Sequence, residues 1–273
     1  MNEGTSDARI VLHHEGKAVA TGPFAPPLYT TRLGPLERFK NDLALRARRR
    51  IFASFMRALA PGPDARVADF GISGHRDHPV HQFFEQLYPY PEHLTAIGQA
   101  SESASWYVDA FPGVSYLEAD LRSIPLPDNH FDVGFCNAVV EHAGTRAEQA
   151  KLVREVCRVS RAVVFTTPNR GFPVELHTFL PFVHWLPISL FHHVLGVFGN
   201  HALANVAKLN PLSAAEMLAL FPLERNTRLL NSGPLLLQSN LICISFARLT
   251  ATASIREVVV ETARRACAAD TIG

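Results

Sequence analysis

The sequence has few cysteines, no excess of either charge and no long apolar run. Its four cysteines, Cys136, Cys157, Cys243 and Cys267, are scattered over 273 residues and form no CxxC pair. This spacing argues against a structural zinc site or a disulfide framework and suits a reducing compartment. Uninterrupted apolar stretches stay below the ~20 residues that a bilayer-spanning helix needs. We therefore expect neither a disulfide-rich scaffold nor a membrane-spanning protein.

The charge balance excludes a strongly basic or acidic binding surface. The chain has 26 basic and 25 acidic residues and a net charge of +1, so we expect no nucleic-acid partner. The one basic run, 46–50, falls in a helical segment and is typical of a solvated helix face. The first 16 residues carry acids and no apolar core, which predicts no secretory signal. The expected location is the cytoplasm.

Short apolar strands alternate with helical segments through the middle of the chain. This alternation predicts right-handed βαβ crossovers and a parallel sheet. Two later extended segments, with no helix between them, predict an antiparallel edge hairpin. The fold class is therefore α/β: a three-layer Rossmann-like sandwich with a mostly parallel seven-stranded sheet and an antiparallel edge hairpin. The first expected strand and its glycine turn lie at 66–74, and the other expected strands at 94–98, 114–118, 131–136, 161–167, 225–231 and 240–246. The expected helices lie at 36–59, 81–88, 148–159 and 255–269, with a further one that follows 99–103 and runs to about 110.

The predicted domain organisation has one core domain with two extensions. Residues 1–35 contain several Gly-Pro and Pro-Pro pairs and predict an N-terminal arm without a core of its own. Residues 36–248 form the expected α/β domain, which includes an apolar insert at 172–210. Residues 249–273 are expected to be a C-terminal helix and tail.

Two stretches predict a ligand site at the carboxyl ends of the strands. The first strand runs into a turn that contains Gly71 and Gly74, and a helix follows, as in phosphate-binding and nucleotide-binding turns. The strand at 131–136 is followed by Asn137, Glu141 and His142. In open α/β sheets the ligand crevice lies at these strand ends. An ordinary βα turn and a loop with ordinary polar residues are the alternative interpretations.

These two stretches, the acid Asp120 after the third strand and the late antiparallel pair form one pattern. The pattern resembles a class I S-adenosylmethionine-dependent methyltransferase (methyltransferase type 11-like). The resemblance runs from about residue 50 to 246. It is most specific in the segments 120–132, 137–142 and 167–173. It implies methyl transfer as the activity and S-adenosylmethionine as the cofactor.

The resemblance places the first cofactor motif on Asp69, Gly71, Ser73 and Gly74. These positions would bring the backbone close to the methionine part of the cofactor. The family usually has a GxGxG pattern here, whereas the stretch FGISGHRDHP supplies only two glycines. Because glycine allows close backbone approach, the thinner motif favours a methyltransferase-like protein that has lost turnover.

A second departure from the family pattern is Gln99. It stands where the family has an acid that accepts hydrogen bonds from both ribose hydroxyls. A neutral amide lacks the charge assistance that roughly doubles the strength of such bonds. Glu102 is close enough in the sequence to substitute for the missing acid.

The resemblance assigns further cofactor contacts to the third and fourth strand ends. Asp120 corresponds to the acid that accepts from the adenine amine, and the backbone N–H of Leu121 would reach the adenine ring. Asn137 and Ala138 lie where the family's loop faces the amino-acid end of the cofactor. His142 would stand beside the transferred methyl group.

Within the apolar insert, residues 176–207 contain histidines and no charged side chains. Between Glu175 and Lys208 there is no Asp, Glu, Lys or Arg, but there are five histidines, at 177, 184, 192, 193 and 201. A metal site, a buried cap over the sheet, and an apolar lid or membrane-touching surface over 176–207 are the three interpretations. We expect no metal, because no carboxylate or cysteine joins the histidines at ligand spacing. In the family this insert often covers the acceptor, which makes His177 and Trp185 the substrate-side candidates.

The leading functional hypothesis is methyl transfer to a small-molecule or lipid-like acceptor. A hydroxyl or amine acceptor needs a general base, and His142 and His177 are the catalytic candidates. A catalytically inactive, methyltransferase-like binding or scaffold protein is the alternative. A nicotinamide-dependent reductase is disfavoured because the chain lacks a GxGxxG turn. The sequence leaves the oligomeric state and the identity of the acceptor open.

Overall fold

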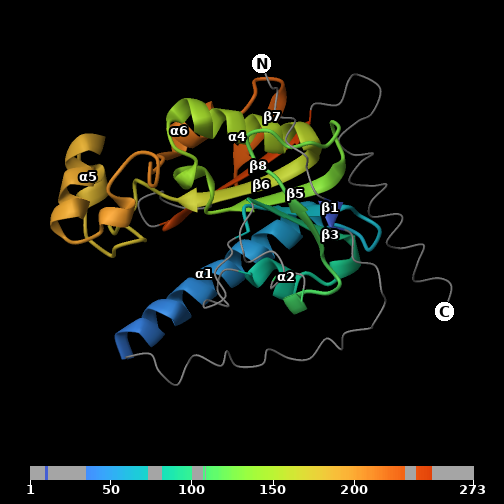
Figure 1. The fold of residues 1–273 in the computed structure, drawn as a ribbon, viewed down its shortest axis with the longest axis horizontal. Helices are drawn as coiled ribbons and strands as arrows, with labels where there is room; N and C mark the ends of the chain where they lie inside the picture. The colour runs from blue at the N-terminus through green and yellow to red at the C-terminus, as the bar shows by residue number, and fades with distance from the viewer. Residues whose placement is uncertain are drawn as a thin grey trace, which may run out of the picture.

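The computed structural model describes residues 10–11, 35–72, 82–99, 107, 109–230 and 238–247. Ser73, Gly74 and Glu102 lie outside these residues, as do the expected C-terminal helix and nearly all of the expected N-terminal arm. The described part folds around a single twisted sheet with helices on both faces (Figure 1).

The sheet has the order β1-β4-β3-β2-β5-β6-β8-β7. Strands β4, β3, β2, β5 and β6 are parallel, whereas β8 pairs antiparallel with both β6 and β7. The mostly parallel seven-stranded sheet with an antiparallel edge pair is thus confirmed. An eighth strand of two residues, β1, pairs antiparallel with β4 at the other edge. The strand bounds are Ile10–Val11 (β1), Val67–Phe70 (β2), Leu94–Gly98 (β3), Ser115–Glu118 (β4), Phe131–Asn137 (β5), Ser160–Pro168 (β6), Arg225–Leu229 (β7) and Asn240–Ala247 (β8).

Strand β5 lies near the middle of the sheet and is buried on both faces. Five of the six residues 131–136 are apolar or glycine, and Asp132 is the exception, as a covered parallel strand requires. The strand was expected to stop at Cys136. It continues to Asn137, because Asn137 is still in register with Thr166 of β6. The polar side chain therefore stands on the last position of the strand.

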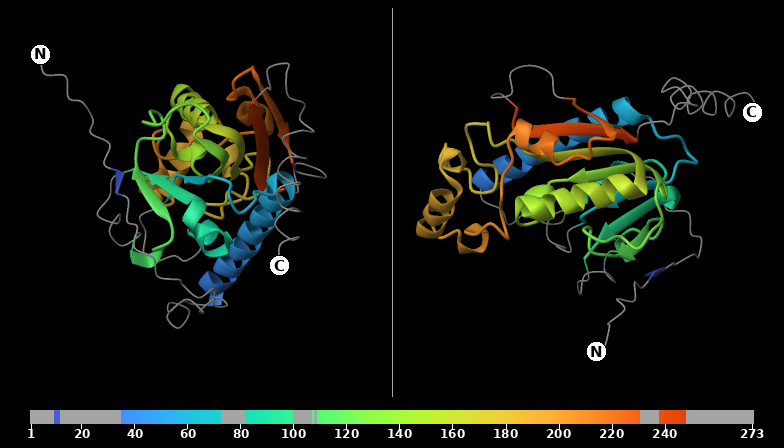
Figure 2. Two further views of the ribbon diagram at one scale, coloured as in Figure 1. Left: turned by 90° about the vertical axis from the view of Figure 1, so that its right-hand side faces the viewer. Right: turned by 90° about the horizontal axis from the view of Figure 1, so that it is seen from above.

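The helices form two layers, one on each face of the sheet (Figure 2). Helices α1 (Pro35–Leu59) and α2 (Phe83–Leu87) cover one face, where Phe55 and Phe84 pack against Phe135 of β5. Helices α4 (Arg146–Val159) and α6 (Ala214–Ala219) cover the other face, and their apolar residues share a second core. Four single-turn helices lie at Pro91–His93 (η1), Val140–His142 (η2), Val183–Trp185 (η3) and His201–Leu203 (η4).

Helix α5 (Ile188–Val197) belongs to the insert and forms a separate lobe. Phe191, Leu195 and Leu209 make a small core within it. The lobe extends beyond the end of β6 and does not lie on a face of the sheet (Figures 1 and 2). The interpretation as a buried cap over the sheet is therefore wrong, because the other helices already cover both faces. Within the described ranges, no helix is long and apolar enough to cross a membrane.

Candidate functional site

The strand order reverses between β2 and β5, and this reversal positions the candidate site. From β2 the chain moves outward through β3 to β4 and then returns to place β5 on the other side of β2. Ligands of open α/β sheets bind at the carboxyl ends of the strands at such a point. Asp69 lies in β2 and Gly71 directly after it, while Asn137 is the last residue of β5 and Ala138 follows. The structure thus brings these four predicted residues together on the side of the sheet where the parallel strands end.

Gly71 forms a tight turn directly after β2. Its φ is +89°, and its N–H donates to the carbonyl of Ile97 at 2.7 Å. A Cβ atom at this position would collide with the side chain of Val139, which belongs to the loop after β5. Only glycine combines a positive φ with so close an approach of a neighbouring loop. The turn and the β5 loop therefore meet at the strand-order reversal.

The side chain of Asp69 fastens β2 to helix α2. It is buried and faces Glu85, whose Oε1 accepts a hydrogen bond from the Tyr107 hydroxyl at 2.6 Å. Burial and the neighbouring Glu85 raise the pKa of Asp69 well above its usual value, and burial also raises the pKa of Glu85. The Asp69 side chain is therefore turned into the protein, and what Asp69 offers the crevice is its backbone.

We predict that Glu85→Gln weakens the pH dependence of stability. Both pKa values are raised in the folded protein above the ordinary values of 3.8 and 4.5. Above about pH 4.5 the unfolded chain therefore releases protons that the folded protein still holds. The free energy of unfolding of the wild type should therefore fall as the pH rises through and above these values. Urea unfolding between pH 5 and 8 should show a smaller fall in the variant. The exposed Glu92→Gln is the control, and equal slopes for wild type and Glu85→Gln would contradict the prediction.

Gln99 and Asp120 follow β3 and β4 and lie further along the same side of the sheet, at the carboxyl ends of the strands. Gln99 follows β3, is exposed, and its carbonyl accepts from the Tyr116 hydroxyl at 3.4 Å. Asp120 follows β4 and accepts hydrogen bonds from the backbone and guanidinium N–H groups of Arg122 at 2.9–3.2 Å. Side-chain hydrogen bonds from Arg122 lower the pKa of Asp120. Asp120 is thus an ionised, partly exposed acceptor, while the neighbouring Leu121 is buried.

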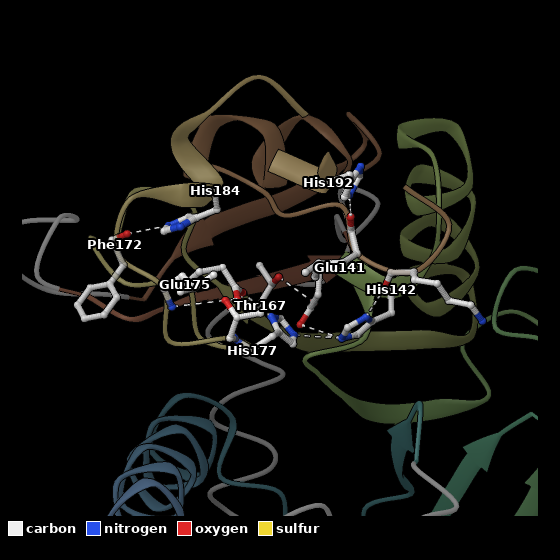
Figure 3. A network of polar contacts seen from close by, with 12 residues as sticks. Glu141, His142, Thr167, Phe172, Glu175, His177, His184 and His192 are labelled. Atoms are coloured by element: carbon white, nitrogen blue, oxygen red, sulfur yellow. Dashed lines mark hydrogen bonds and ion pairs between the residues drawn. The ribbon is translucent and has the colours of Figure 1, made fainter. Parts of the chain in front are cut away.

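Two histidines from different segments meet beyond the carboxyl ends of β5 and β6 (Figure 3). His142 ends η2, directly after β5, and His177 lies in the segment after β6. Their Nε2 atoms are 3.3 Å apart, and the ring planes are perpendicular. The fold therefore brings the two predicted general-base candidates together, although 35 positions separate them in the sequence.

Each histidine ring is oriented through its Nδ1 atom by an oxygen acceptor. His142 Nδ1 lies 2.6 Å from the carbonyl oxygen of Lys208, and His177 Nδ1 lies 2.7 Å from Oε1 of Glu175. Because carbonyl and ionised carboxylate oxygens only accept, both Nδ1 atoms carry the hydrogen. If both rings are neutral, each Nε2 atom carries a lone pair and no hydrogen, so neither can donate to the other. The pair therefore needs one further proton, or another cation, between the rings.

Two buried glutamates surround this pair. Glu141 is fully buried, and its Oε2 accepts from the Thr167 hydroxyl at 2.8 Å. Burial alone would raise the pKa of Glu175, but hydrogen bonds from His177 and Thr178 outweigh it and lower this pKa to about 2. Burial alone would lower the pKa of His177, and Glu175 outweighs that effect and raises it. We call Glu141, His142, Glu175 and His177 the Glu–His cluster.

The sequence pointed to part of this cluster only. Glu141 stood out because it follows the buried strand, whereas Glu175 and Thr167 were missed. The Glu-x-His spacing of Glu175 and His177 is a signal that could have found the former. Trp185, a substrate-side candidate, lies elsewhere and lines a shallow depression with Arg170, Gly171, Ser213 and Glu216.

The other histidines of the insert do not join the cluster. Buried His184 and His192 each point Nε2 at a carbonyl oxygen 2.8 Å away, of Phe172 and Leu209 respectively. These contacts hold the lobe together. The remaining two, at 193 and 201, are exposed. His177 is therefore the one histidine of the insert that the structure places in the candidate site.

Comparison with known sequences gives a match over part of the chain. Residues 82–162 match the family model of a methyltransferase domain. Over 62 residues the chain is 36% identical to malonyl-[acyl-carrier protein] O-methyltransferase of Pseudescherichia vulneris, a match that covers 23% of this chain and 25% of that protein. The chain thus spans about a quarter of the length of this curated relative.

Comparison with solved structures gives similar folds at low sequence identity. The PH0226 protein of Pyrococcus horikoshii OT3 has a TM-score of 0.50 and 11% identity, over 81% of this chain and 96% of that one. An S-adenosylmethionine-dependent methyltransferase from Mesorhizobium loti has a TM-score of 0.47 and 16% identity, over 70% of this chain and 95% of that one. At such identities the likeness concerns the fold alone, and the first of the two structures supports it.

Proposed function

We propose that this chain is a class I S-adenosylmethionine-dependent methyltransferase and transfers a methyl group to a small or lipid-like acceptor. The match of residues 82–162 to a methyltransferase-domain model supports this proposal. The cofactor is S-adenosylmethionine. One observation carries the proposal: the glycine turn after β2 and the end of β5 meet at the reversal of the strand order. In open α/β sheets the ligand crevice lies at the carboxyl ends of the strands at such a reversal.

The residues at this edge fit the chemistry of the cofactor. The backbone at Gly71 is free of a Cβ atom, Asn137 ends β5, and ionised Asp120 is partly exposed. A sulfonium or ammonium group needs acceptors near it, because an unpaired charge is costly away from water. When bound, S-adenosylmethionine supplies an electrophilic methyl group that the acceptor atom displaces in line. The protein's contribution is largely positioning and exclusion of water.

The Glu–His cluster lies on the acceptor side of the proposed site. Glu141 and His142 follow Asn137 in the loop after β5, and Glu175 and His177 join them from the segment after β6. A hydroxyl or amine acceptor must lose its proton, and the facing Nε2 atoms of His142 and His177 are placed to take it up. A carboxylate acceptor would need no such base.

The insert supports a small or lipid-like acceptor. Residues 176–207 contain no Asp, Glu, Lys or Arg. Several large apolar side chains of this stretch are exposed: Phe179, Phe182, Trp185, Leu190, Val197 and Phe198. An exposed apolar surface next to a site favours an apolar substrate or contact with a membrane surface. We include peripheral membrane contact through 176–207 in the proposal.

The first test is cofactor binding by calorimetry on the wild type and Asp120→Ala. We expect the wild type to bind both S-adenosylmethionine and S-adenosylhomocysteine. The variant should bind about 10-fold to 100-fold more weakly, because it loses a hydrogen bond to a charged acceptor, worth roughly 1.5–3 kcal/mol. Asp120→Asn keeps one acceptor oxygen and should lose less.

Two control variants make this test specific. Asp128→Ala removes another carboxylate that pairs with an arginine, Arg158. Asp128 precedes β5 and therefore lies at the amino ends of the strands, away from the proposed site. The affinity of Asp128→Ala should equal that of the wild type. Arg122→Ala frees Asp120 from its ion pair and shows whether a disturbed loop alone weakens binding. If the wild type shows no binding at about 1 mM cofactor, the scaffold hypothesis replaces this proposal.

A further inference from the structure

We propose that Glu141, His142 and His177 form a binding site for a divalent transition-metal ion, with zinc as the ion that fits best. A carboxylate oxygen of Glu141 and the Nε2 atoms of the two histidines all lie within 4.8 Å of one another. Two histidines and one glutamate are a known ligand set of catalytic zinc. The sequence argued against a metal because no carboxylate joined the histidines of the insert. The fold supplies Glu141 from a different loop.

The distance between the two histidines suits a shared ion. Zinc binds histidine nitrogens at about 2.0–2.1 Å in tetrahedral geometry, so two such nitrogens lie about 3.3–3.4 Å apart. The Nε2 atoms of His142 and His177 are 3.3 Å apart. Oε1 of Glu141 is 3.9 Å from His142 Nε2 and needs to move inward by about 0.5–1 Å to complete the set.

The groups behind the ligands prepare them for a metal. Metal-binding histidines usually donate their other N–H to a carboxylate or carbonyl group, which fixes the tautomer and raises the basicity of the free nitrogen. His177 donates to Glu175, and His142 donates to the carbonyl of Lys208. With hydrogens on both Nδ1 atoms, the lone pairs are on the two Nε2 atoms, which lie 3.3 Å apart (Figure 3).

The third ligand atom, Oε1 of Glu141, is a buried acceptor that no described residue donates to. Glu141 is fully buried, and Thr167 occupies only its Oε2 atom. Among the described residues, Oε1 of Glu141 has no hydrogen-bond donor. A buried polar atom is normally satisfied, because leaving it unpaired costs about 1–3 kcal/mol. A cation between Oε1 and the two Nε2 atoms would satisfy all three at once.

Three protein ligands leave the fourth position of a tetrahedral ion open. In catalytic zinc sites this position holds water or substrate. The inference here rests on the proposed function: an acceptor oxygen bound at the fourth position would lie beyond Asn137, on the acceptor side of the cofactor site. Coordination would lower the pKa of that oxygen, and the histidines would then act as ligands and not as bases.

The test is metal binding to the full chain after removal of metal with a chelator. Titration with ZnCl₂ by calorimetry, and with CoCl₂ by visible absorption, should give one ion per chain and the absorption of tetrahedral cobalt. His142→Ala and His177→Ala should each weaken zinc binding by more than about 100-fold, since removal of mere supporting groups already costs 10-fold to 100-fold. Glu141→Gln keeps the size of the side chain and the acceptor for Thr167, and it should weaken binding while the fold is retained.

Matched controls distinguish this site from incidental histidine binding. His193→Ala removes an exposed histidine of the same lobe and should leave zinc affinity unchanged. Near-ultraviolet circular dichroism reports whether each variant is folded. Zinc affinity that is equal in the wild type, His142→Ala and Glu141→Gln would overturn the metal site, as would the absence of binding to the wild type. S-adenosylmethionine binding, measured on the same samples, tests the proposed function separately.

Discussion

Replacing Gly71 with alanine is expected to lower the affinity for S-adenosylmethionine by about 10-fold to 100-fold. The positive φ of +89° disfavours any residue with a Cβ atom by about 1–2 kcal/mol. The added Cβ also collides with Val139, and overpacking of this kind costs about 1–3 kcal/mol. The turn and the β5 loop must then separate where the cofactor is proposed to bind. Calorimetric titration with the cofactor measures the loss.

A second substitution separates the two causes. Val139→Ala removes the methyl groups that the new Cβ would meet. The double variant Gly71→Ala with Val139→Ala should therefore recover the part of the affinity lost through the collision, but not the part lost through the positive φ. Val139→Ala alone is the reference for the cycle. Wild-type affinity in Gly71→Ala would show that this turn does not shape the cofactor site.

Replacing Phe135 with alanine should lower the free energy of unfolding by about 3–5 kcal/mol. Phe135 is fully buried on β5, two residues before Asn137. Its ring stacks on Phe84 at 4.5 Å between centroids and meets Phe55 and Phe83 edge-on at 5.4 and 5.9 Å. Alanine would leave a cavity where α1, α2 and the central strand meet. Urea unfolding monitored by circular dichroism measures the change.

Two further variants calibrate this stability prediction. Phe135→Leu keeps most of the apolar volume and loses the aromatic contacts, so it should cost roughly 1–2 kcal/mol. Phe198→Ala removes the same side chain from the surface of the lobe, where it is 62% exposed. It should change stability by less than about 0.5 kcal/mol. An equal loss in Phe135→Ala and Phe198→Ala would mean that β5 does not organise the core.

The local patterns of the sequence were sufficient for the order and type of the central elements. Strand β5 and helix α4 were predictable because a strand buried on both faces is a continuous apolar run, while a half-buried helix repeats its apolar residues every three to four positions. Strand β1, with two residues, is too short to produce such a pattern. The placement of the insert was missed because its apolar side chains fit a lobe with its own core as well as a cap.

The sequence by itself determined the parallel sheet, the strand ends that carry Gly71, Asp120 and Asn137, and the family resemblance, because each of these depends on neighbours along the chain. Only the tertiary structure decided the Glu–His cluster. His142 and His177 are 35 positions apart, and their meeting depends on how the segment after β6 folds back over the end of β5. Hydrophobic periodicity carries no information about such a contact, since neither histidine lies in a strand or an α-helix. The direction of each lone pair likewise follows from acceptors, Lys208 and Glu175, that the fold alone brings into place.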